Sequence, residues 1–176
     1  MRCKNNIHFA YTALTLFALM LGGCGGPRVL KIAAEAGPEL NPDGNGDPLS
    51  LVVHVHQLRS AEAFKRISLD TLAAGKSEQE LLGKTLVSSR EILLLPNEKA
   101  EDQDAFSEET RFIGVIGLFR QGDRNYWRLL FPIDALKKDT LSFAAGPCFL
   151  SAKDNRNQAL PGQSEQAPLE CRGKAD

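Results

Sequence analysis

Two histidines, His54 and His56, lie two residues apart in an alternating apolar segment. Successive side chains of a strand point to opposite faces, so this spacing places both imidazoles on one face, where they could supply two metal ligands. A third ligand is missing, because His8 falls in the N-terminal segment and the sequence forces no carboxylate toward that face. We interpret the pair as surface or packing histidines, and a metal site or ligand site is the alternative.

Two other groups of residues, one of carboxylates and one of serines, could bind a metal ion or act as nucleophiles. The acidic run could bind Ca²⁺ but lacks the D-x-D-x-D-G loop order, so a solvated hairpin arm is the better interpretation. Its members are Glu98, Glu101, Asp102, Asp104, Glu108 and Glu109. The serines Ser88, Ser89 and Ser142 lack a G-x-S-x-G elbow, and two histidines on one strand offer little material for a triad. We therefore expect neither an enzyme nor a cofactor.

The N-terminal segment has the features of a secretion signal. Arg2 and Lys4 precede an apolar stretch, residues 7–21, that is too short to span a bilayer core of roughly 30 Å. Small residues directly before Cys24 resemble the site read by lipoprotein signal peptidase, whereas a conventional signal that happens to end in Cys is the alternative. The sequence thus predicts a signal peptide over residues 1–23 and acylation of Cys24.

The acylated Cys24 would begin a short tether, residues 24–28. Each buried methylene contributes about 0.8 kcal/mol, and stable anchoring needs about two acyl chains, so a fully acylated cysteine would hold the chain to lipid. No Asp follows the cysteine, and by resemblance to sorted lipoproteins this favours the outer membrane. We expect the protein at the periplasmic leaflet of that membrane.

Removal of residues 1–23 leaves a chain long enough for one domain with a real core. It also takes away two basic residues, so the formal net charge falls from −1 to −3. Phosphate contacts require a basic surface, and nucleic acid is therefore not an expected partner.

Cys148 and Cys171 are the two cysteines that remain after the signal and the acylated residue are set aside. The predicted compartment is oxidising, and no C-x-x-C or histidine-rich spacing surrounds either residue. A disulfide is therefore expected, and the loop of about twenty residues that it closes would contribute about 3 kcal/mol in the chain-entropy model. It would attach the polar C-terminal tail to the domain.

Alternating apolar residues and regularly spaced turns predict several short strands, the pattern of a β-sandwich. The strand segments are residues 30–35, 51–58, 90–95, 111–120, 125–131 and 141–150. A helical insertion at about 60–83 includes a capping box that starts at Ser77. The segment 111–119 is apolar on both faces, so we expect a central strand that the insertion covers, with Gly114 and Gly117 allowing close approach. The tail, residues 152–176, is expected to have little structure.

The order and spacing of these segments resemble the TssJ (VasD/SciN) lipoproteins of the type VI secretion system. The residues that carry the resemblance are Leu40-Asn41-Pro42-Asp43, Val53 to Leu58, Ser60 to Phe64, Glu91 to Pro96, Arg111 to Arg120, and Trp127-Arg128. It implies a transthyretin-like two-sheet β-sandwich with a short helical insertion, here over residues 29–151. It also implies a partner, the periplasmic C-terminal region of an inner-membrane TssM protein.

The resemblance places the partner-binding element in the loop between the first two strands, residues 37–48. Its expected contact residues are Glu39, Leu40, Asn41, Pro42, Asp43, Gly44, Asn45, Gly46 and Asp47. Leu40 among polar neighbours would be the apolar anchor, and the prolines would limit the entropy lost on docking. Two other functions stay open: a metal-binding or ligand-binding lipoprotein that uses His54 and His56, and a pilot lipoprotein that escorts a secretin.

Overall fold

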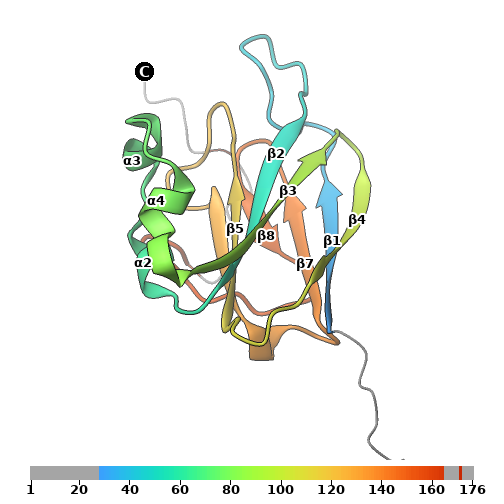
Figure 1. Cartoon of the computed structure of the whole chain (residues 1–176). Coiled ribbons are helices and arrows are strands. Elements are labelled where there is room, and N and C mark those ends of the chain that lie inside the picture. Colours follow the sequence, from blue (N-terminus) through green and yellow to red (C-terminus); the bar gives the residue numbers. More distant parts are fainter. Residues whose placement is uncertain (1–27, 165–170, 172–176) are drawn as a thin grey trace, which may run out of the picture.

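The computed structural model describes residues 28–164 and Cys171, whose strands form two four-stranded sheets packed face to face (Figure 1). One sheet has the order β4-β1-β7-β8 and the other the order β3-β2-β5-β6. The strands are β1 (Val29–Ala36), β2 (Leu51–Leu58), β3 (Leu86–Leu94), β4 (Lys99–Ala105), β5 (Phe112–Gly117), β6 (Arg128–Pro132), β7 (Thr140–Ala145) and β8 (Leu150–Ala152). The predicted two-sheet β-sandwich is confirmed.

The main core lies between the two sheets, and alternation along the strands builds it. In β1, Leu30 and Ile32 are buried while Lys31 is exposed, the period of two that a half-buried strand requires. β1 pairs antiparallel with β4 and parallel with β7, whereas all pairs of the second sheet are antiparallel. β1 runs toward the end of the sandwich from which the β1–β2 loop projects, and its first residue lies at the opposite end (Figure 1).

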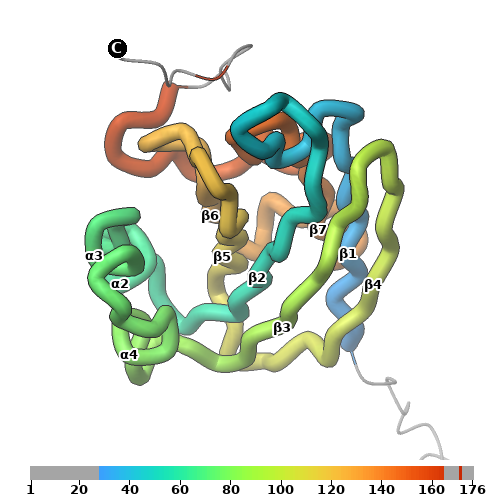
Figure 2. The backbone as a smooth tube through the Cα atoms, turned by 90° about the horizontal axis from the view of Figure 1, so that it is seen from above, coloured from blue at the N-terminus to red at the C-terminus, as the bar shows by residue number. Residues whose placement is uncertain are grey.

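A layer of short helices connects β2 to β3 and covers part of the outer face of the second sheet (Figure 2). It comprises α2 (Glu62–Arg66), α3 (Leu69–Ala73), α4 (Glu78–Leu82) and a 3₁₀ turn, η2 (Gly83–Thr85), while a second 3₁₀ turn, η3 (Ile133–Ala135), follows β6. The predicted capping box is present, because Ser77 accepts from the Glu80 N–H and Glu80 accepts from the Ser77 N–H. No helix among the described residues is long and apolar enough to cross a membrane.

The contact between this helical layer and β5 depends on a glycine of β5. A Cβ at Gly114 would collide with the ring of Phe64 in α2, so glycine permits the close approach that the sequence predicts. Gly117 differs from that prediction, because the space beside it is filled by Phe119 and not by the helices. On β6, the buried Arg128 donates to the carbonyls of Phe64 and Lys65 and so fixes the end of α2.

The middle of the acidic segment differs from the predicted solvated arm. Glu101, Asp102 and Asp104 lie on β4, which pairs with β1 at the edge of the first sheet, whereas Glu98, Glu108 and Glu109 lie outside this strand. Glu101, Glu108 and Glu109 are exposed, as a solvated arm requires. Asp102 accepts two hydrogen bonds of 2.8 Å from Arg90, and Asp104 accepts one of 2.9 Å from Gln57. Side chains from the other sheet thus satisfy these carboxylates, which explains why a strongly charged sequence still adopts a strand.

The start of the C-terminal tail is packed, contrary to the expectation of little structure. Asn155 is 6% exposed and accepts a 2.7 Å hydrogen bond from the Ser142 N–H, while Leu160 is 3% exposed beneath the helical layer. Gln158 donates its N–H to the Leu130 carbonyl at 2.7 Å. The domain therefore extends beyond the predicted boundary at residue 151.

Candidate functional site

The β1–β2 loop contains, near its start, a residue that belongs to the core. Leu40 is 0% exposed and packs in the main cluster between the sheets, while Leu49 returns a backbone hydrogen bond of 3.0 Å to the Leu40 carbonyl. The prediction that Leu40 is an exposed anchor for a partner is wrong. One apolar residue among polar ones predicts an anchor for a partner. In the structure this residue instead packs in the core and attaches the loop to it.

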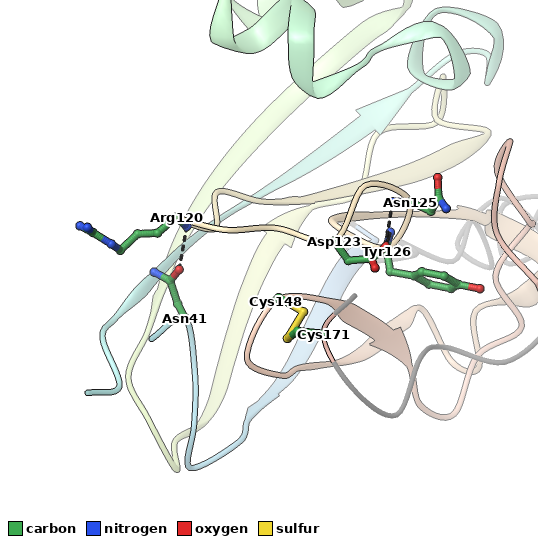
Figure 3. The surroundings of a disulfide bond; sticks show 7 residues. All are labelled: Asn41, Arg120, Asp123, Asn125, Tyr126, Cys148 and Cys171. Carbon is green, nitrogen blue, oxygen red and sulfur yellow. Dashed lines mark hydrogen bonds between the residues drawn. A yellow bond between two sulfur atoms is a disulfide. The ribbon is translucent and has the colours of Figure 1, made fainter. Parts of the chain in front are cut away.

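Asn41 holds the base of the loop in place. It adopts a positive φ of 45°, which Asn tolerates better than most residues, and its side chain bridges two segments. Its amide donates to the Ser50 carbonyl at 2.8 Å, and its oxygen accepts the Arg120 N–H at 2.8 Å (Figure 3). Asn41 is thereby a positioning residue and, at 5% exposed, has little surface for a partner.

The tip of the loop is exposed but internally bonded. Asp43 accepts the N–H groups of Asn45 and Asp47 at 2.8 and 3.0 Å, and backbone hydrogen bonds link Asp43 to Gly46 and Asp47. These backbone donors favour the charged form, so the pKa of Asp43 lies below its ordinary value. Gly46 has a φ of 92°, which suits glycine at a turn. Residues 44–48 are exposed on this ordered turn, as is Glu39 nearer its base.

A disulfide between Cys148 and Cys171 lies near the base of the loop (Figure 3). Both cysteines line a pocket together with Pro42, Gly122 and Pro147. The loop base, the β5–β6 connection and Cys171 thus meet at one end of the sandwich, beside the loop tip.

An exposed apolar patch, formed by Leu93 and Leu118, lies on the outer face of the second sheet. These side chains are 55% and 43% exposed and flank Val52, while Leu95, directly after β3, is 50% exposed. The sequence predicts both segments only as strands. Alternation with a buried Leu94 could have identified the outward-facing residues, although not the absence of a helix over them.

The histidine pair meets a carboxylate that the sequence did not reveal. Glu78, the first residue of α4, accepts from His54 Nδ1 at 2.9 Å and from His56 Nε2 at 2.5 Å through the same oxygen, Oε2. Glu91 on β3 lies 3.2 Å from the other ring nitrogen of His54. The prediction that a third ligand is missing is therefore wrong, because α4 folds back over β2 and brings Glu78 to the pair.

This triad of His54, His56 and Glu78 is largely withdrawn from water. Side-chain exposures are 22% for His54, 2% for His56 and 12% for Glu78. Burial raises the pKa of Glu78, but hydrogen bonds and charge from the two histidines outweigh it and lower that pKa to about 2. The hydrogen bond to Glu78, opposed by burial, raises the pKa of His54. His56 Nδ1 is buried without a hydrogen-bond partner among the described residues.

The predicted lipidation site, Cys24, lies outside the described residues. The structure gathers the tip of the β1–β2 loop, the disulfide and the apolar patch toward one end of the sandwich, while the histidine triad lies further along the outer face of the second sheet, under α4.

Several solved structures resemble this chain in fold. The chain resembles TssJ1, a type VI secretion lipoprotein from Pseudomonas aeruginosa, at 27% identity and a TM-score of 0.62, covering 77% of this chain and all of that one. A chain of a type VI membrane complex matches at 23% identity and a TM-score of 0.65, covering 73% and 99%. A structure described as the TssM C-terminal domain from EAEC matches at 22% and 0.62, covering 71% and 97%.

No curated protein matches the chain. A family model does, over residues 28–148, and it is described as type VI secretion lipoprotein, VasD, EvfM, TssJ. The match includes both sheets up to β7, the helical layer and the β1–β2 loop. This chain therefore belongs to the type VI secretion lipoprotein family.

Proposed function

We propose that this chain links the type VI secretion membrane complex to the outer membrane by binding the periplasmic C-terminal region of a TssM-type inner-membrane protein. Family membership supports the secretion role, and the likeness to chains in a type VI membrane complex and a TssM domain structure supports the partner. The protein acts as an adaptor and not as an enzyme. Acylated Cys24 at the periplasmic leaflet is its membrane anchor.

The observation that carries the choice of binding element is the ordered tip of the β1–β2 loop. Its exposed residues 44–48 are held by bonds to Asp43, and its base is fixed by Asn41, so little conformational freedom remains to be lost on docking. Because Leu40 is buried in the core, the adjacent patch of Leu93 and Leu118 supplies the apolar contacts of the interface. A polar tip beside an apolar patch has the composition of a protein interface.

Calorimetric titration of the mature protein in detergent micelles with the TssM C-terminal domain tests whether the tip of the β1–β2 loop is the binding element. In one variant a Gly/Ser segment of equal length replaces residues 43–48, with Leu40, Asn41 and Leu49 kept. We expect binding to weaken by at least about tenfold, because truncated hot-spot residues typically cost more than about 1 kcal/mol. Leu93→Ser, at an exposed position, should also weaken binding.

The matched control changes a different exposed turn of the same molecule. Ala74→Gly with Lys76→Ser alters the connection between α3 and α4, which lies away from the loop, and should leave affinity unchanged. Circular dichroism should be the same for all variants. Equal affinity for the wild type and the loop replacement would assign the site elsewhere, and no binding by the wild type would contradict the proposed partner.

The membrane anchor has a separate test. Cys24→Ser removes the acylation site, so after a salt wash the variant should leave the outer-membrane fraction, whereas the wild type remains. A Cys24→Ser protein that still sediments with the outer membrane would show that lipid at this residue is not the anchor.

A further inference from the structure

We propose that His54, His56 and Glu78 form a binding site for one divalent transition-metal ion of the zinc type. The three residues each offer one ligand atom, and these atoms all lie within 4.8 Å of one another. Two imidazoles and a carboxylate are a donor set that zinc accepts, with water in the fourth position. The inference is independent of partner binding by the loop.

The geometry needs only a small adjustment to accept an ion. Zinc–nitrogen and zinc–oxygen bonds of about 2.0–2.2 Å in a tetrahedron place ligand atoms roughly 3.3 Å apart. Glu78 Oε2 now lies 2.9 Å from His54 Nδ1 and 2.5 Å from His56 Nε2, where it accepts the hydrogen atoms that an ion would replace. A shift of Glu78 Oε2 by less than about 1 Å would bring both of these separations to that value.

Two further contacts suit a metal ligand. His54 Nε2 faces Glu91 at 3.2 Å, the outer carboxylate that commonly orients a ligating histidine and fixes its tautomer. His56, whose side chain is 2% exposed, directs Nε2 at the same Glu78 oxygen that faces His54 Nδ1, so the two ring nitrogens converge on one point.

Bound metal would connect two elements of the fold, because the histidines lie on β2 and Glu78 on α4. In the absence of metal only hydrogen bonds to Glu78 make this connection through the triad. The expected result is that the ion raises the unfolding temperature of the protein, since it binds the folded arrangement and not the unfolded chain.

The test is titration of the mature protein in detergent micelles with ZnCl₂, by calorimetry and by thermal unfolding. We expect one ion bound per chain. Glu78→Gln and His54→Gln should each weaken binding by at least about tenfold, because even loss of an outer partner has an effect of that order. The matched control is Glu101→Gln, which removes an exposed carboxylate from β4 and should bind like the wild type.

Absence of saturable zinc binding by the wild type, or equal affinity of the wild type and both triad variants, would overturn the proposal. If both variants fail to fold, the Co²⁺ spectrum of the wild type decides. Intense visible bands of a tetrahedral ion support the site, and the pale spectrum of an octahedral aqua ion overturns it.

Discussion

Glu78→Gln isolates the charge that connects α4 to β2. Glutamine keeps the shape of the side chain but cannot carry the charge that two histidine donors now face. The Glu78 side chain is only 12% exposed, so water replaces little of what is lost. The protein should therefore remain folded but be markedly less stable.

The magnitude follows from the Glu78 carboxyl. Its pKa falls from 4.5 to about 2 on folding, which at about 1.4 kcal/mol per pKa unit corresponds to about 3 kcal/mol of folding free energy. Because the folded pKa is depressed, this stability is present above pH 4.5 and is lost as the pH falls toward 2. His54, whose pKa is raised, gives stability below pH 6.5 that is lost as the pH rises through the raised value. The two pKa shifts describe the same contact between Glu78 and His54, so their free energies are not added.

The assay is urea unfolding, in the presence of EDTA, followed by the fluorescence of Trp127, which is 2% exposed. At pH 6 we expect Glu78→Gln to be less stable than the wild type by about 3 kcal/mol, or roughly 6–12 °C in Tm. At pH 3 the gap should shrink to about half, because the carboxyl of the unfolded wild type is then protonated.

Glu91→Gln is the matched control, since it also faces His54 but its side chain is 70% exposed, so its contribution should be small. Equal stability of Glu78→Gln and the wild type at pH 6, or a gap of the same size at pH 6 and pH 3, would refute the reasoning.

Two further predictions concern the loop and the tail. Leu40→Ala should lower the unfolding free energy by about 2–5 kcal/mol, because the side chain is fully buried, and denaturant unfolding that matches the wild type would contradict its place in the core. Replacing Cys148 and Cys171 together with Ala should lower stability by about 3 kcal/mol at most, and free thiols at both positions of the unreduced wild type, seen by mass spectrometry, would contradict the bridge.

The sequence predicts the strands whose side chains alternate or are apolar on both faces. β1 and β2 show the period of two, and the apolar run at β5 predicts a central strand, because a strand covered on both sides needs no polar face. β4 escapes prediction, since the partners of Asp102 and Asp104, Arg90 and Gln57, lie on the opposite sheet. Because Asp is depleted in strands, residue propensities predict that such carboxylates are solvated. Their hydrogen bonds depend on tertiary structure, which propensities do not describe.

The candidate sites are less predictable, because they depend on contacts between distant segments. Spacing places His54 and His56 on one face, but Glu78 reaches them only after α4 folds over the sheet. The loop was identified as an element, and the burial of Leu40 was missed because local sequence does not show which side of a loop meets the core. Asn155 was missed for the same reason, since its partners lie in η3 and β7.

The direction of β1 has a consequence for how far the protein can reach. At about 3.3 Å per residue, its eight residues carry the chain roughly 26 Å from the start of the domain to the end that bears the loop. If Cys24 is acylated as proposed, the few residues before Val29 add at most about 3.5 Å each. With the start of β1 attached to lipid in this way, the loop tip would lie at the end of the domain remote from that attachment, which is the end that a partner reaching from the inner membrane would approach.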